Sequence, residues 1–185
     1  MVSYQANSQA SIEEIYQQQN RITQSGMYVL GGWAVGNLVL NSGLLLGNPE
    51  GRTRHFYQMN IYWNLVNASL AGISLIQLNK TKNAELGMVD LLNRQKKLEN
   101  ILLLNVGLDV AYVVGGFYLR ELGKDESRNQ DLLTGFGNAV ILQGSFLLIF
   151  DTMLYIIHAR HAKKWMSVLS HLQLSHQGVG VRFRL

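Results

Sequence analysis

Charged residues are gathered into short blocks, and this segregation limits the folds open to the chain more than any other feature. Residues 22–49 and 55–79 contain no Asp, Glu, Lys or Arg, and residues 100–119 and 132–159 contain one Asp each. A stretch of about 20 predominantly apolar residues is long enough to cross the hydrocarbon core of a bilayer as a helix. The sequence therefore predicts four transmembrane helices.

A water-soluble helical bundle is the main alternative, because the mean hydropathy of the whole chain is close to neutral. Such a bundle would carry charged side chains along the outer face of every helix, whereas each of these stretches contains at most one charged residue. We therefore predict an all-α fold, an integral membrane antiparallel four-helix bundle with cytoplasmic helical extensions. The predicted spans are residues 27–46, 56–78, 100–119 and 132–158.

The predicted transmembrane domain covers residues 27–172, between two different end segments. In residues 1–26, Ser11-Ile12-Glu13-Glu14 has the pattern of a capping box, which predicts the start of an amphipathic helix at the membrane interface. Residues 173–185 form a basic tail in which apolar and basic residues alternate. That pattern fits a short strand or a lipid-touching tail, and a disordered end fits as well.

The distribution of Lys and Arg predicts the orientation of the bundle, since cytoplasmic loops carry an excess of these residues. The two termini and the second loop would hold eleven of them: Arg21, Lys80, Lys82, Arg94, Lys96, Lys97, Arg160, Lys163, Lys164, Arg182 and Arg184. The first and third loops would hold five: Arg52, Arg54, Arg120, Lys124 and Arg128. We therefore expect both termini to lie in the cytoplasm, for a multi-pass protein of the inner membrane.

Helical apolar patterns continue beyond two of the predicted spans, upstream of the third and downstream of the fourth. Both continuations would lie on the cytoplasmic side and could pack together. We expect the third helix to begin near Asn83 or Ala84. The side of this helix that carries Met88 and Leu92 should pack against Trp165 or Leu169.

Each predicted span carries amide or carboxyl side chains at helical spacing. These polar residues are Asn37, Asn41, Asn60, Asn64, Asn67, Asn105, Asp109, Asn138, Gln143 and Asp151. They should face the bundle interior, because a lipid-facing amide would have no hydrogen-bond partner. A rise of about 1.5 Å per residue sets Asn37, Asn67 and Asp109 near the midplane, which makes the two amides the expected neighbours of Asp109. The same arithmetic sets Asp151 and Asn105 together, nearer the cytoplasm.

These polar groups have two interpretations. They could be structural, since interhelical hydrogen bonds join transmembrane helices at about 0.6 kcal/mol each and glycines allow close approach. Glycines at helical spacing occur in Gly32-xxx-Gly36 and Gly43-xxx-Gly47, and again at Gly115, Gly116 and Gly144. Alternatively, Asp109 and Asp151 could bind a proton or a cation, because an ionised carboxyl at this depth is costly and no Lys or Arg lies beside it.

Other classes of site find little support in the sequence. The chain has no cysteine, which excludes thiol–disulfide chemistry. His158 and His161 have the helical spacing of a weak metal-ligand pair, but neighbouring basic residues favour contact with lipid headgroups. No cofactor is predicted. The basic residues flank the apolar spans, so the sequence pI of about 9.4 indicates a lipid bilayer as partner rather than a nucleic acid.

The stretch from His55 to Asn67, HFYQMNIYWNLVN, is the most distinctive in the chain. It resembles a motif of an uncharacterised bacterial family of small four-helix membrane proteins. The resemblance implies the four-helix fold and a bacterial inner membrane, and it implies no activity.

Three classes of function follow from these patterns. An accessory or assembly subunit would bind itself or another membrane protein through its glycine faces and cytoplasmic extensions. A conduit or carrier would pass protons or a small polar solute along the Asn and Asp layers. An enzyme is the least favoured, because the sequence contains no recognisable nucleophile–base pair or metal set.

Overall fold

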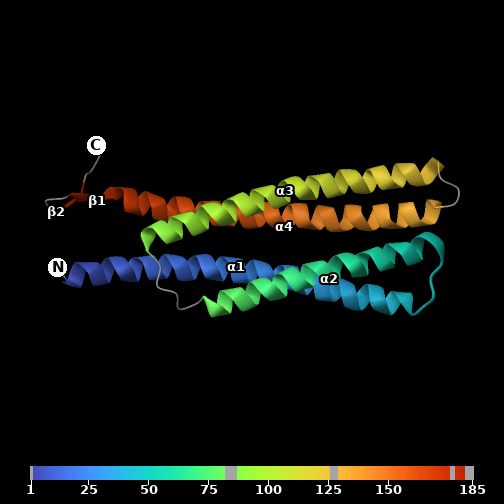
Figure 1. Cartoon of the computed structure of the whole chain (residues 1–185), viewed down its shortest axis with the longest axis horizontal. Coiled ribbons are helices and arrows are strands. Elements are labelled where there is room, and N and C mark those ends of the chain that lie inside the picture. The colour runs from blue at the N-terminus through green and yellow to red at the C-terminus, as the bar shows by residue number, and fades with distance from the viewer. Residues whose placement is uncertain (1, 82–86, 126–128, 176–177, 182–185) are drawn as a thin grey trace.

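Four long helices lie side by side in the computed structural model and alternate in direction along the chain (Figure 1). They are α1 (Val2–Leu45), α2 (Gly51–Lys80), α3 (Met88–Asp125) and α4 (Gln130–His171), followed by a hairpin of strands β1 (Leu172–Ser175) and β2 (Gly178–Val181). The structure describes residues 2–81, 87–125, 129–175 and 178–181, with side chains in residues 12–81, 87–125 and 129–166. Apart from this hairpin, every described element is a helix, as the all-α prediction requires.

The helices are arranged as two antiparallel pairs, α1 with α2 and α3 with α4 (Figure 1). The pairs meet mainly where α2 packs against α4, and these two helices run in the same direction. Both ends of the described chain lie at one end of the bundle, where α2 ends and α3 begins. The up-and-down order of the predicted bundle is therefore present.

Polar residues are buried in this bundle while large apolar residues are exposed. The side chains of Asn60, Asn64 and Gln143 are fully buried, whereas Val39 is 70% exposed and Leu104 is 64% exposed. A soluble monomer rarely exposes so large an apolar surface, but lipid tails are a good solvent for it. All four helices are long and apolar enough to cross a membrane.

Glycines set the close approach of α3 and α4. A Cβ on Gly144 would lie 3.1–3.2 Å from atoms of Tyr112 and Val113, so the α4 backbone rests on these side chains. At the other end, Gly51 begins α2 with φ of +53°, a conformation that glycine adopts readily. Asp131 of α4 occupies the space that a Cβ of Gly51 would need.

The N-terminal part of the chain differs from the prediction. The expected separate helix does not start at the Ser11 capping box, since α1 begins at Val2 and continues without a break to Leu45. Gly26 does not interrupt α1, because its lack of a side chain lets Leu154 of α4 pack against it. Residues 12–26 pack against α3 and α4 as part of the bundle.

The predicted extension of the third helix is confirmed, with corrections. α3 begins at Met88, where Asp90 accepts a hydrogen bond from the backbone N–H of Gly87, and the predicted starts at Asn83 and Ala84 lie outside the described residues. Leu92 is exposed, so that part of the prediction is wrong. Leu91 is the buried residue, and it packs with Trp165 and Met88.

The two predicted extensions of the third and fourth helices pack together as expected, and α1 joins them. Leu91, Ala162 and Trp165 form a buried cluster with Tyr16, and Met88 packs against it. The side chain of Leu169, the other predicted contact, lies outside the described side chains. In the tail, the strand alternative is the one found, with Leu172 paired to Val181, while residues 182–185 are outside the description.

Candidate functional site

Several of the buried asparagines donate a hydrogen bond to a backbone carbonyl of their own helix. The Nδ2 group of Asn60 donates to the carbonyl oxygen of Phe56, and that of Asn64 donates to the carbonyl of Asn60. On α1, the Nδ2 groups of Asn37 and Asn41 donate in the same way, each to the carbonyl four residues earlier. Donors used within the helix leave the side-chain oxygens free to accept hydrogen bonds from neighbouring helices.

Gln143 connects three helices through these free oxygens. Its Oε1 accepts a hydrogen bond of 2.9 Å from Trp33 Nε1, and its Nε2 donates to Asn60 Oδ1 at 2.5 Å. The same Nε2 lies 3.5 Å from Asn37 Oδ1. We refer to Gln143, Trp33, Asn37 and Asn60 as the Gln143 cluster. It links α4 to both α1 and α2, and the ring of Trp33 stacks on Phe146 beside it.

Asp109 and Asp151 form a carboxyl pair between α3 and α4. The two carboxyls are close enough to interact with each other, and Asn105 lies near Asp151. Asp109 is 3% exposed and Asp151 is 6% exposed. Two carboxyl groups can share a hydrogen bond only when one of them carries a proton. The pair is therefore the most unusual chemical feature of the bundle interior.

The positions of these carboxyls correct the depth estimate in two respects. Asp109 and Asp151 were expected in different layers, yet their carboxyls are close enough to interact. Asn37, expected beside Asp109, instead belongs to the Gln143 cluster. The expected proximity of Asn105 and Asp151 is present.

The remaining predicted residues are less closely connected. Asn41 is buried and Asn138 is half-buried near the opposite end of the bundle from the termini. Asn64 and Asn67 are buried on the same face of α2 as Asn60. Within the described residues, Asn64 Oδ1 and Asn67 Nδ2 have no hydrogen-bond partner, nor does Asp109 Oδ2.

A second polar cluster lies toward the termini, in segments predicted to leave the membrane. Gln19 Nε2 donates to Gln95 Oε1 at 2.6 Å, and Gln95 Nε2 donates to Glu99 and to the backbone carbonyl of His158. His158 Nε2 lies 3.3 Å from the hydroxyl of Thr23. No sequence pattern indicated Gln19 or Gln95, because a buried glutamine and a surface glutamine look alike in an amphipathic helix.

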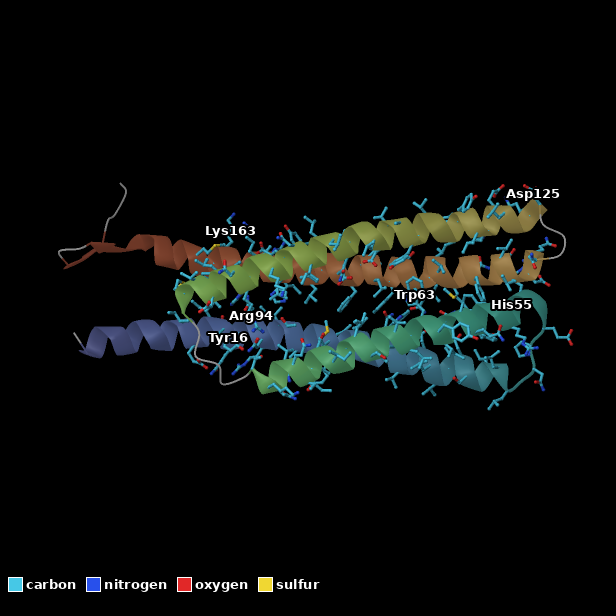
Figure 2. The ribbon with its side chains drawn as sticks, viewed as in Figure 1. Tyr16, His55, Trp63, Arg94, Asp125 and Lys163 are labelled. Atoms are coloured by element: carbon cyan, nitrogen blue, oxygen red, sulfur yellow. The ribbon has the colours of Figure 1, made fainter. Side chains whose placement is uncertain are left out.

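Tyr16 and Arg94 close the bundle at this end (Figure 2). The Tyr16 hydroxyl donates to the carbonyl of Thr81 at 2.5 Å, and the Arg94 guanidinium lies 4.9 Å from the Tyr16 ring centroid. Arg94 also donates to Asn20 Oδ1. These contacts tie α1 to the end of α2 and to the start of α3.

The two histidines proposed as a weak metal pair contact different partners. His158 is fully buried against Thr23, while His161 Nε2 lies 3.1 Å from Gln18 Oε1. In the described part of the chain, no group of three or more His, Cys, Asp or Glu side chains is arranged to hold a metal ion. The histidines therefore join α4 to α1.

Two cavities bear on the question of a conduit. One of about 380 Å³ is a surface hollow lined by residues of α3 from Asn93 to Leu104. The other, of about 320 Å³, lies between α1 and the end of α2, beside Asn20 and Leu78. Neither cavity reaches Asp109.

Comparison with known proteins gives a family without an assigned activity. A model described as "Family of unknown function (DUF6992)" matches residues 29–152, well over half of the chain, so the chain belongs to this family. An uncharacterised family is consistent with the resemblance of the His55–Asn67 stretch, and the matched residues include the Gln143 cluster and both carboxyls. No curated protein and no solved structure matches the chain.

Proposed function

We propose that this member of the DUF6992 family is an integral membrane protein that serves as an accessory or assembly subunit, with α1 as its docking helix. The observation that carries the proposal is a row of open glycines on α1. A Cβ built on Gly32, Gly36 or Gly43 would meet no atom of the described residues within 4 Å. The fold of the chain itself therefore leaves these glycines unused.

The glycines of α4 provide the contrast. Cβ atoms on Gly135, Gly137 and Gly144 would each lie within about 3.2 Å of another helix, so these glycines serve packing inside the bundle. In a membrane, small residues four apart let two helix backbones approach closely, which strengthens van der Waals contact between them. The same spacing on α1 is available to a helix outside the bundle.

The open glycines share one face of α1. At 3.6 residues per turn, Gly32, Gly36 and Gly43 fall within about 40° of one another around the helix axis. Val39 lies on this face and is 70% exposed. A shallow groove of glycines beside large aliphatic side chains is the surface that a second transmembrane helix fits.

A second open run of small residues lies on α3, at Gly107, Ala111 and Gly115. Ala111 is exposed, and a Cβ on either glycine would find open space among the described residues. A subunit that bridges two partners would have two such faces. The partner is a second copy of this chain or a helix of another membrane protein.

The surroundings proposed for the bundle are the lipid bilayer of a bacterial inner membrane, with both termini in the cytoplasm. The excess of Lys and Arg at the end of the bundle that holds the termini supports this orientation. The exposed aliphatic side chains of all four helices support contact with lipid.

A conduit is the competing function. It requires a polar path from one end of the bundle to the carboxyl pair, and the two cavities described above lie away from that pair. The Gln143 cluster uses its polar groups to join helices, which is the behaviour expected of a structural core. These observations favour the subunit.

The test is to fill the open groove. Gly36→Leu and Gly32→Leu should leave the fold intact, because the space around them is empty, and should reduce cross-linked complexes recovered from membranes by about tenfold, which corresponds to ~1.4 kcal/mol. Gly72→Leu is the matched control, since it fills an equally open glycine position on α2. Unchanged complexes in both α1 variants would refute the docking role of this face.

A further inference from the structure

The carboxyl pair and the unpaired amides of α2 lie at one level of the bundle. Asn60 contacts Gln143, and α2 and α4 run in the same direction, so seven residues further along each helix Asn67 stands level with Phe150 and Asp151. A rise of about 1.5 Å per residue applies to both helices, which keeps the register over this distance.

A contact between α2 and α3 leads to the same position for Asn67 along the bundle axis. The ring of Trp63 packs edge-on against Tyr112 of α3, with centroids 4.8 Å apart, near the middle of the bundle in Figure 2. Because α2 and α3 run in opposite directions, a step of four residues forward on α2 matches a step of four residues back on α3. Asn67, four residues after Trp63, is therefore level with Leu108, next to Asp109. Two independent contacts thus place Asn67 at the level of the carboxyl pair along the bundle axis.

The polar atoms at this level are incompletely satisfied. Asp109 Oδ2, Asn64 Oδ1 and Asn67 Nδ2 are buried and have no hydrogen-bond partner among the described residues. Asn64 is fully buried and Asn67 is 4% exposed, so bulk water does not supply their hydrogen bonds. A buried polar atom without a partner costs about 1–3 kcal/mol, and this cost disappears if a ligand contacts it.

The charge of the site restricts what that ligand is. Two carboxyls in contact need one proton between them, which leaves one negative charge surrounded by apolar helices. On α1, Tyr28 is the titratable residue near this level, and its side chain is 60% exposed on the outside of the bundle; the described part of α2 has none there. The nearest other titratable groups on α3 and α4 are Tyr112, Tyr155 and His158, and His158 is engaged with Thr23.

We propose that Asp109 and Asp151, with Asn64, Asn67 and Asn105 around them, form a binding site for one additional positive charge, a proton or a small alkali cation such as Na⁺. Carboxyl and amide oxygens are the ligands that hard cations prefer. Asn64 Oδ1 and Asp109 Oδ2 supply free acceptors for the ligand, and Asn67 Nδ2 is a donor suited to the opposite carboxylate oxygen. This site is independent of the docking face on α1.

The experiment measures thermal unfolding of the purified chain in detergent micelles, in NaCl or choline chloride at equal ionic strength and over a series of pH values. Cation binding should raise the unfolding midpoint by about 3 °C for each tenfold increase in Na⁺ above its dissociation constant. Proton binding should lower the midpoint as pH rises, since deprotonation leaves two charges in contact, with no difference between Na⁺ and choline.

Asp109→Asn and Asp151→Asn should each abolish the response, because an amide preserves the shape and removes one charge. Asp125→Asn, at the exposed end of α3, is the control and should retain it. A midpoint in the wild type that depends on neither Na⁺ nor pH would overturn the proposal, and so would a response that persists unchanged in both variants.

Infrared spectroscopy of the wild type provides a second measurement if the variants fail to fold. A carbonyl band of a buried protonated carboxyl, shifted on transfer to heavy water, should be present for a bound proton and should weaken as Na⁺ is added for a bound cation. Absence of this band together with absence of a Na⁺ effect would overturn the proposal.

Discussion

Gly116 of α3 and Gly137 of α4 lie backbone against backbone. A Cβ on Gly116 would be 2.8 Å from the carbonyl oxygen of Gly137, and a Cβ on Gly137 would be 2.7 Å from the carbonyl oxygen of Gly116. Real Cβ atoms do not approach so closely, so the contact excludes any other residue at either position. It explains why α3 and α4 form the more intimate of the two helix pairs.

The adjacent residues Gly115 and Gly116 should respond differently to substitution by alanine. Gly116→Ala should destabilise the fold by about 1–3 kcal/mol, because the added methyl group forces the helix backbones apart. Gly115→Ala should leave stability unchanged or slightly higher, since its Cβ would find open space. Thermal unfolding of the two variants measures the difference, and equal midpoints would show that the close approach is absent.

The bond between Gln143 and Asn60 should appear as an energetic coupling. In a double-mutant cycle of Gln143→Ala and Asn60→Ala, we expect a coupling of about 0.6 kcal/mol and at most ~1.7 kcal/mol, as for other interhelical hydrogen bonds in membranes. Chemical unfolding in micelles measures it. Pairing Gln143→Ala with Asn138→Ala is the control, and coupling equal to that of the first pair would contradict the geometry.

Tyr16→Phe tests the closure of the bundle at its terminal end. The variant removes the hydrogen bond to the Thr81 carbonyl and should cost about 0.5–1.5 kcal/mol of stability. Tyr28→Phe on the same helix is the control and should change stability by less than about 0.5 kcal/mol, because Tyr28 is exposed. Circular dichroism during heating compares the two, and an equal loss in both would argue against the Tyr16 contact.

The orientation in the membrane can be tested directly, since the natural chain has no cysteine. A single cysteine at Arg52 should react with an impermeant maleimide added outside the cell, and a single cysteine at Lys96 should react only after the membrane is opened. The physical reason is the excess of basic residues at the end that carries Lys96. Labelling of the two positions in the opposite order would reverse the proposed topology.

Segregation of charge determined the helices and their number. Stretches with few charges that are long enough to cross a bilayer are a local property of the sequence, so the four helices and their alternating order could be predicted without knowledge of packing. The inward orientation of Asn60, Asn64 and Gln143 also followed locally, because an amide in lipid has no partner. Helix ends were less predictable, as the uninterrupted α1 demonstrates.

Contacts between helices were decided only by the tertiary structure. Depth counted from each helix end put Asp109 and Asp151 in different layers, but in the bundle the two carboxyls are close enough to interact. Burial of Gln19 and Gln95 could not be predicted from the sequence either, since it depends on neighbours that are far away in the chain. The sequence alone determined which residues face the interior of the bundle. The relative positions of the helices decided which of these residues contact one another, because such contacts join residues that are distant in the chain.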